Sequence, residues 1–192
     1  IYALATPMGK AALAVFRGSG GGCHEIISEI LDKNIGQFNK VFLRKILHDG
    51  VLVDVSTVVF YKGPKSYTGE DMVEIFCHGG FATVKKLIDL FQNLNIREAE
   101  PGEFTKIAVL NNKQTLNEAE SLLDLINSTT DVEMNMALGV VAGELSNIVS
   151  ELGDELDAIR VFVESIIDFD DEDGVDVGME EVVDRLEVLR LG

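Results

Sequence analysis

Short apolar runs dominate the first part of the chain, and such runs are typical of buried β-strands. They predict strands over residues 11–17, 38–47, 51–61 and 72–77. Asp49 and Gly50 lie between the second and third runs, and Asp-Gly suits the two-residue turn of a β-hairpin. Apolar residues three and four positions apart predict helices over 23–32 and 81–94. This mixture predicts a domain of the α+β class.

Beyond residue 100 the apolar pattern is helical throughout. Pro101-Gly102-Glu103 begins one short predicted helix, and another is expected over 116–128. From 131 to about 167 the pattern continues without proline, which predicts one helix on the order of 50 Å long. A further helical pattern covers 179–191. We therefore expect an α+β domain over residues 1–116 and part of an all-α helical domain over 117–192.

Composition and charge narrow the function classes. The chain has 192 residues and a net charge of −17, which argues against a broad nucleic-acid-binding surface but not against a local basic patch. No apolar run approaches the roughly 18 residues of a membrane span, and no signal-peptide pattern opens the chain. The only cysteines, Cys23 and Cys77, are too few for a disulfide framework. A reducing, cytoplasmic setting is the expectation.

Two short motifs only partly match nucleotide-binding loops. The glycine run at 18–22 lies between a strand and a helix, but the third glycine of a dinucleotide fingerprint falls on Cys23. Asn112 and Lys113 resemble the start of a guanine-specificity motif, whose aspartate position is occupied by Thr115. The better interpretations are a strand-to-helix turn and a surface lysine.

Metal-binding patterns are also incomplete. Cys23-His24 and Cys77-His78 do not have the spacing of a zinc site, and adjacent residues on a strand point to opposite faces. The acidic segment 166–180 resembles a calcium loop, with Asp171, Asp173 and Glu180 at ligand positions, but Phe169 stands at the first position. We interpret this segment as a solvated loop and expect no metal site.

Glu74 is the strongest candidate functional residue, because it interrupts the apolar strand over 72–77. Burying an unpaired carboxylate is costly. Glu74 could reach solvent at the strand end or pair with a lysine. It could also bind a ligand that presents a fork of donors, such as the amine and ring N–H of a pterin. The anionic tail of such a ligand calls for a cation, and Arg17 and Lys113 are the nearest candidates in type.

Four stretches of the sequence together resemble one protein family. They are ALATPMGKAALAVFRGSG at 3–20, SYTGEDMVEIFCHGG at 66–80, EAEPGEFTKIAVLNNKQTLNEAESLLDLI at 98–126 and VESIIDFDDED at 163–173. Their content and order resemble the N-terminal region of the tRNA modification GTPase family MnmE, also called TrmE. The first stretch is similar to the family's opening strand–turn–strand. Departures include Pro7-Met8-Gly9-Lys10 for the usual Pro-Pro-Gly-Arg, Ile107 for an arginine, and Gln114-Thr115 for Leu-Asp.

The resemblance implies a folate-binding domain similar to that of aminomethyltransferases, followed by the helical domain with its long helix. It implies a homodimer that binds 5-formyltetrahydrofolate at its interface, with Arg17, Glu74 and Lys113 as the folate contacts. No residue of this chain is expected to be catalytic. The GTPase domain, with its GTP, magnesium and potassium ions, is expected outside these 192 residues.

The resemblance implies that the parent protein installs a carboxymethylaminomethyl-type group on C5 of the wobble uridine of certain tRNAs. It also implies an FAD-dependent partner protein of the MnmG family, with tRNA held through the complex. Two alternatives stay open from the residues. One is a stand-alone folate enzyme of the aminomethyltransferase kind, and the other is a dimerisation module with a vestigial pocket.

Overall fold

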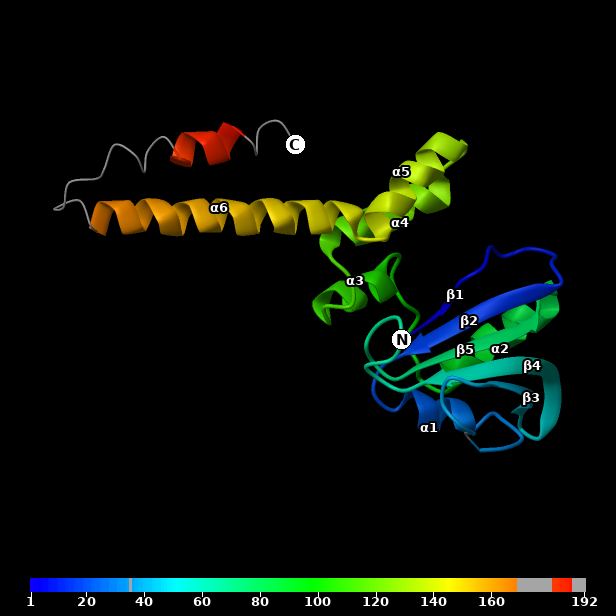
Figure 1. The fold of residues 1–192 in the computed structure, drawn as a ribbon. Coiled ribbons are helices and arrows are strands. Elements are labelled where there is room, and N and C mark those ends of the chain that lie inside the picture. The colour runs from blue at the N-terminus through cyan, green and yellow to red at the C-terminus, as the bar shows by residue number, and fades with distance from the viewer. Residues whose placement is uncertain (35, 169–180, 188–192) are drawn as a thin grey trace. The chain divides into compact units, whose positions relative to one another are not determined.

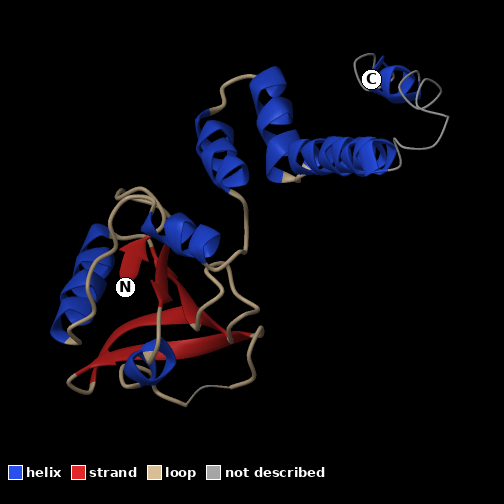
Figure 2. Ribbon diagram, turned by 90° about the vertical axis from the view of Figure 1, so that its left-hand side faces the viewer, coloured by secondary structure: helices blue, strands red, loops and turns tan. Residues whose placement is uncertain are grey.

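A five-stranded antiparallel sheet forms the centre of the first part of the protein in the computed structural model, which describes residues 1–34, 36–168 and 181–187 (Figures 1 and 2). Its strand order is β1-β2-β5-β4-β3. The strands are β1 Tyr2–Leu4, β2 Leu13–Ser19, β3 Val41–His48, β4 Val51–Tyr61 and β5 Met72–His78. The four runs predicted to be strands are confirmed with small shifts of their ends. β1 is too short to show a pattern of its own.

The turn between β3 and β4 is the predicted hairpin turn. Asp49 has φ 52° and Gly50 has φ 77°, so both central residues are left-handed. This combination defines the turn type whose twist matches that of the flanking strands. The Asp-Gly prediction is therefore confirmed.

One face of the sheet carries the hydrophobic core. Alternate residues of the central strands, such as Phe16, Val58 and Ile75, are almost fully buried there. Helix α2, Phe81–Asn93, packs against β4 and β5 from this side, with Val84, Leu87, Leu90 and Phe91 buried (Figure 1). A helix with one apolar stripe is stabilised by burying that stripe on a sheet.

Helix α1, Cys23–Ser28, is shorter than the predicted 23–32. Ile30 and Leu31 follow it and are still buried in the core, and Leu31 forms a β-bridge with Ile46. The apolar spacing therefore correctly indicated that Ile30 and Leu31 are buried. They do not continue the helix, because this segment pairs with β3 instead.

Among the described residues, the other face of the sheet carries exposed apolar side chains. A transverse row of register partners crosses this face: Ala3, Arg17, Glu74, Val59 and Val41. Val41 and Leu43 are 71% and 69% exposed, and Leu13 on β2 is 59% exposed. Glu74 thus lies in line with an exposed apolar surface.

The rest of the described chain is helical. Its helices are α3 Glu103–Leu110, α4 Leu116–Asn127, α5 Asp131–Val141, α6 Glu144–Asp168 and a short segment over 181–187. The chain divides into two compact units, residues 1–119 and 120–192. An α+β part followed by an all-α part is confirmed. Among the described residues, no helix has the length and apolarity needed to cross a membrane.

The single long helix predicted over 131–167 is wrong. The structure has two helices, because Gly143 takes φ 85° and ends the first of them. Glycine adopts this left-handed conformation at helix ends without steric cost. The remaining helix α6 has 25 residues, or about 37 Å at the standard rise per residue.

Two expectations near the C-terminus fall wholly or partly outside the described residues. The helix expected over 179–191 is seen over 181–187. The acidic segment with Asp171, Asp173 and Glu180, interpreted as a solvated loop, lies outside the described residues.

Candidate functional site

Arg17 and Glu74 are direct cross-strand partners on β2 and β5, so their side chains project from the same face. Arg17 Nε donates a hydrogen bond to Glu74 Oε1 at 2.7 Å. The hydroxyl of Tyr61, at the end of β4, donates to Glu74 Oε2 at 3.1 Å. The Glu74 side chain is only 12% exposed. Both carboxylate oxygens therefore have a donor, which offsets the cost of removing the charge from water.

Tyr61 is kept protonated by this arrangement. Burial and the negative charge of Glu74 raise the pKa of the Tyr61 hydroxyl above its usual value. Tyr61 is consequently a stable hydrogen-bond donor to Glu74 across the physiological pH range.

Tyr67 lies close to the other end of the Arg17 side chain. The Arg17 guanidinium carbon is 5.7 Å from the centre of the Tyr67 ring, within the range of a cation–π contact. The Tyr67 hydroxyl is 2.9 Å from Thr105 Oγ1 on α3. Within the described part of the chain, the two terminal nitrogens of Arg17 make no hydrogen bond, so they can meet an acceptor on a ligand.

A cavity of about 290 Å³ opens beside Glu74. It is lined by Tyr61, Lys65, Ser66, Tyr67, Met72 and Glu74. Tyrosine rings and a methionine offer flat, polarisable surfaces, while Glu74 accepts hydrogen bonds and Lys65 carries positive charge. This combination suits a planar heterocycle that has N–H donors on one edge and an anionic substituent.

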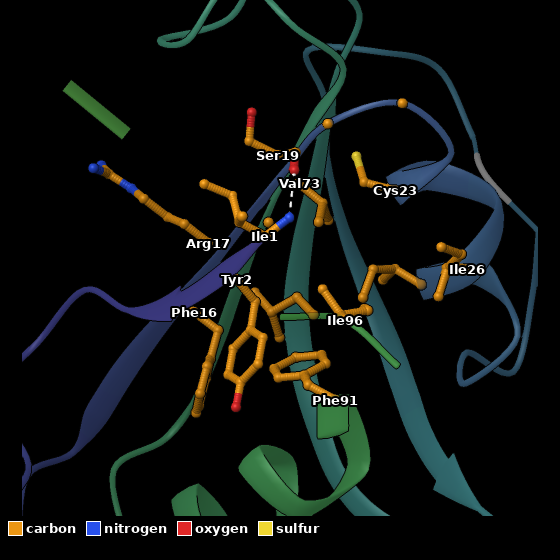
Figure 3. A pocket seen from close by; sticks show the side chains of 15 residues that line it. Ile1, Tyr2, Phe16, Arg17, Ser19, Cys23, Ile26, Val73, Phe91 and Ile96 are labelled. Atoms are coloured by element: carbon orange, nitrogen blue, oxygen red, sulfur yellow. Dashed lines mark hydrogen bonds between the residues drawn. The ribbon is translucent and has the colours of Figure 1, made fainter. Parts of the chain in front are cut away.

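A second cavity, of about 80 Å³, lies beside core residues of the sheet (Figure 3). Tyr2, Phe16, Phe91 and Ile96 gather in it, whereas the Arg17 side chain points away from this apolar cluster. Among the described residues that line it there is no carboxylate. Its lining is mostly apolar, although Arg17 and Ser19 also contribute to it.

The loop over 62–71, which joins β4 to β5, supplies Lys65, Ser66 and Tyr67 to the larger cavity. At its ends, Lys62 Nζ lies 2.7 Å from Asp71 Oδ2, and the Gly63 amide donates to Asp71 Oδ1 at 3.0 Å. The hydrogen bond from Lys62 and that from Gly63 lower the pKa of Asp71 despite partial desolvation. The buried His24 ring is also close, with Nδ1 3.6 Å from Asp71 Oδ2.

His24 Nε2 is 3.1 Å from the carbonyl oxygens of both Tyr61 and Met72. Because both neighbours are acceptors, Nε2 carries the proton and donates to them. These carbonyls belong to the last residue of β4 and the first of β5. His24 therefore fixes the two points from which the 62–71 loop departs.

The middle of the 62–71 loop is held from both sides. Ser19 Oγ is 2.7 Å from Thr68 Oγ1 and donates to Glu70 Oε2 at 2.9 Å. From the turn after α3, Asn111 Nδ2 donates to the Thr68 carbonyl at 2.7 Å. Gly69 takes φ 79°, and a side chain there would lie 3.1 Å from Asn111 Cβ. The positive φ favours glycine at this position, and a side chain there would also crowd the Asn111 and Lys113 side chains.

Lys113 belongs to the same turn. Its ammonium donates to the Pro64 carbonyl at 2.9 Å, and its aliphatic stem packs beside Gly69. The structure therefore joins Arg17 and Glu74 directly, while Lys113 contacts the 62–71 loop and is not among the residues that line the cavity.

The family profiles cover nearly the whole chain. The profile described as "GTP-binding protein TrmE N-terminus" matches residues 1–113, and that described as "MnmE helical domain" matches residues 116–191. The chain belongs to the MnmE (TrmE) family. The resemblance seen in the sequence motifs is confirmed.

Curated MnmE relatives agree with this assignment. The chain is 44% identical over 195 aligned positions to the tRNA modification GTPase MnmE of Thermotoga sp. strain RQ2, covering 99% of this chain. It is 38% identical to the protein of that name from Clostridioides difficile over 90% of the chain, and 36% identical to that from Aquifex aeolicus over 97%. It spans 42%, 39% and 42% of these three relatives.

Sequence reasoning about the MnmE motifs missed three residues of the site: Tyr61, Lys65 and Tyr67. A usable signal was present, since the chain has only three tyrosines and two of them flank or lie in the 62–71 loop. Tyr61 looked like an ordinary strand residue. Only the pairing of β4 with β5 shows that it is on the same face as Glu74.

The other motifs considered for this MnmE-family chain have structural roles. The glycine run forms the turn from β2 into α1, where Gly22 has φ 79°. Burial raises the pKa of Cys23 to about 12 and that of Cys77 to about 11, so both thiols stay protonated. His78 Nδ1 lies 2.7 Å from Asp54 Oδ1. In the described ranges, no three His, Cys, Asp or Glu residues are placed to hold a metal ion.

Proposed function

We propose that this chain binds a reduced folate, 5-formyltetrahydrofolate, beside Glu74, with Arg17, Glu74 and Lys113 as the residues responsible. The observation that carries the proposal is a nearly buried carboxylate at the wall of a cavity bounded by Tyr61 and Tyr67. A carboxylate has about four acceptor sites, and Arg17 and Tyr61 use two. The remaining sites can accept the amine and ring N–H of a pterin.

The same proposal gives Arg17 a second contact. Its Nε is engaged by Glu74, and its terminal nitrogens are available to an acceptor such as a ring carbonyl. The donors of Arg17 and the acceptor oxygens of Glu74 thus lie side by side. This arrangement matches a ligand edge that carries both an acceptor and donors.

Homodimerisation is the second part of the proposal. The face of the sheet that carries Glu74 also presents the exposed side chains of Leu13, Val41 and Leu43. Exposed apolar patches of this kind mark protein–protein interfaces. A second copy that covers this face would border the folate cavity and exclude water from it.

For the whole protein, we propose participation in modifying C5 of the wobble uridine of certain tRNAs, with the folate as one-carbon donor. GTP hydrolysis with magnesium and potassium is assigned to a part outside these residues, since the sequence contains no Gly-x-x-x-x-Gly-Lys-Ser/Thr loop. Because this chain carries a charge of −17, tRNA is held mainly by an FAD-dependent partner of the MnmG family or by a local basic patch. The proposed location is the cytoplasm.

Calorimetric titration with 5-formyltetrahydrofolate tests the folate assignment. Wild type should bind, and Glu74→Ala should weaken binding by about 100-fold, since a charge-assisted pair of hydrogen bonds is lost. Glu29→Ala is the control, because Glu29 is an exposed carboxylate just after α1 that takes no part in the cavity. Equal affinity of wild type and Glu74→Ala would remove the role of Glu74.

The rival functions predict other outcomes. A dimerisation module with a vestigial pocket predicts a dimer of wild type that binds no folate. A stand-alone aminomethyltransferase-like enzyme predicts one-carbon transfer by this chain alone. Membership of the MnmE family, with the helical part attached, favours the first proposal over both.

A further inference from the structure

We infer that the turn between β5 and α2, with the first two turns of α2 and the loop over 5–12, forms a contact surface for unpaired RNA. This inference rests on the proposed function, which requires tRNA to meet the protein but leaves a local basic patch unplaced. The surface is defined by Lys10, His78, Phe81, Lys85 and Lys86. It is separate from the proposed folate cavity, which none of these residues lines.

Two segments without acidic residues carry this surface. Acidic residues outnumber basic ones by 33 to 16 in the whole chain, yet residues 1–24 and 75–88 contain no aspartate or glutamate. Lys10 lies in the first segment, and Lys85 and Lys86 lie in the second. Within the described part of the chain, none of these three exposed lysines forms an ion pair. A local positive potential can therefore form on a protein whose net charge is negative.

Backbone hydrogen bonds bring the two segments together. The Ala11 amide donates to the Gly79 carbonyl at 3.1 Å, and the Gly79 amide donates to the Ala12 carbonyl at 3.2 Å. A side chain at Gly79 would lie 2.7 Å from the Ala11 carbonyl oxygen, so this close approach of two backbones requires a glycine. Lys10, which precedes Ala11, is consequently held beside the turn that leads into Phe81.

Two exposed rings accompany these lysines. Phe81 is 64% exposed and the side chain of His78 is 68% exposed. Phe81 is the first residue of α2, and Lys85 follows it one turn later on the same face. Aromatic and imidazole rings stack on unpaired bases, while lysines contact phosphates. An RNA segment with unpaired bases would use both kinds of group, whereas an acidic protein surface would use only the lysines.

Asp54 holds the His78 ring in one orientation. His78 Nδ1 lies 2.7 Å from Asp54 Oδ1, and the His78 amide donates to Asp54 Oδ2 at 3.0 Å. The Ser56 hydroxyl also donates to Asp54 Oδ2, at 2.7 Å. Burial raises the pKa of Asp54, but these hydrogen bonds outweigh burial and leave that pKa below its usual value. A ring that is fixed in advance loses less conformational entropy when a base stacks on it.

Fluorescence anisotropy with the purified protein that contains this chain tests the inference. The probes are an RNA hairpin with the sequence of a tRNA anticodon arm, whose loop bases are unpaired, and the fully paired duplex of its stem. Phe81→Ala and His78→Ala should each weaken hairpin binding about 10-fold and leave duplex binding unchanged, because only unpaired bases stack on the rings. Lys10→Met, Lys85→Met and Lys86→Met should each weaken both RNAs about 5-fold and reduce the salt slope of log K by about 0.7–0.9.

Lys33→Met is the matched control, because Lys33 is an exposed lysine outside both segments, and it should bind as wild type does. Lysine variants that bind like Lys33→Met would overturn the inference. Wild-type affinity of Phe81→Ala for the hairpin would also overturn it, since recognition by charge alone fits any anionic partner. Wild type that binds 5-formyltetrahydrofolate but not the hairpin would overturn this inference and leave the proposed folate site intact. Circular dichroism and sedimentation velocity check that each variant keeps its fold and oligomeric state.

Discussion

At the scale of single residues, the central feature is how the sheet accommodates the carboxylate of Glu74. It does so with one donor from each neighbouring strand: Arg17 on β2 and Tyr61 on β4. Neither neighbour lies near Glu74 in the sequence, so the solution depends on the order of the strands. A carboxylate held by two hydrogen-bond donors keeps its orientation before any ligand arrives.

Glu74→Gln should lower the free energy of unfolding by about 1–2 kcal/mol, because a hydrogen bond to a charged group is replaced by weaker ones. Chemical denaturation followed by circular dichroism measures the change. Asp157→Asn is the control, since Asp157 and Arg160 form an exposed pair in α6, and its cost should stay below about 0.5 kcal/mol. Equal effects of the two substitutions would show that the burial of Glu74 is energetically unimportant.

Glu103 gives a prediction about acid. The hydrogen bond from Arg97, followed by that from the Glu100 amide, lowers the pKa of Glu103 to about 2. Because the folded-state pKa is lowered, the stabilisation is present above the unfolded-state pKa of about 4.3 and disappears as pH falls towards 2. Melting temperatures between pH 6 and pH 2 should therefore decline less steeply for Glu103→Gln than for wild type.

Arg97→Met provides an independent check, because it removes the first cause of the shift while leaving the carboxyl in place. It should flatten the same acid limb of the curve. If the melting temperatures of both variants fell with pH as steeply as those of wild type, Glu103 would not be a source of the acid sensitivity.

At the scale of elements, glycines determine where several helices, strands and loops begin and end. Gly50 closes the hairpin at φ 77°, Gly143 separates α5 from α6, and Gly69 lets the 62–71 loop approach the turn after α3. Gly153 is different, because it lies inside helix α6 with open space around it. Glycines in the two settings should respond oppositely to the same substitution.

Gly50→Ala should destabilise the protein by about 1 kcal/mol, since alanine is strained at positive φ even where nothing crowds its side chain. Gly153→Ala should instead stabilise α6 by about 0.5–1 kcal/mol. Thermal and urea unfolding of the two variants, monitored at 222 nm, measures both. A stabilising effect of Gly50→Ala would show that the hairpin turn does not have the left-handed geometry.

At the scale of the whole molecule, the two compact units differ in how completely they bury their apolar residues. Unit 1, residues 1–119, has one continuous core. In unit 2, residues 120–192, large apolar side chains of α6 such as Ile148 and Val149 are 62% and 58% exposed. Stability within a chain follows local burial, so unit 2 should be the weaker one.

Thermal unfolding of the 192-residue chain should therefore show two steps, with loss of helix signal at the lower temperature. Hydrogen exchange should place the first step in 120–192 and the slowest-exchanging amides in β2, β4 and β5. A single transition shared by both regions would contradict this. Residues 1–119 alone are the control and should retain the upper transition.

The open face of the sheet leads to a prediction about assembly. Leu43→Glu should shift the protein towards monomer, because a charge placed in an apolar interface must lose its hydration. Sedimentation velocity measures the change. Phe81→Glu is the matched control, since Phe81 is similarly exposed, at 64%, but begins α2 on the other side of the sheet. A dimer that tolerates Leu43→Glu would place the interface elsewhere.

The sequence by itself determined most of the elements, the hairpin turn and the family, and it singled out Glu74 as a candidate, because apolar period, turn chemistry and an acidic residue in an apolar strand are local signals. The sequence did not predict the helix break at Gly143, since one glycine within a helical pattern does not force the helix to end. Only the tertiary structure decided that Arg17 and Tyr61 flank Glu74 and that Lys113 contacts Pro64. These contacts join residues far apart in the chain, and strand order and loop path, which no local pattern encodes, bring them together.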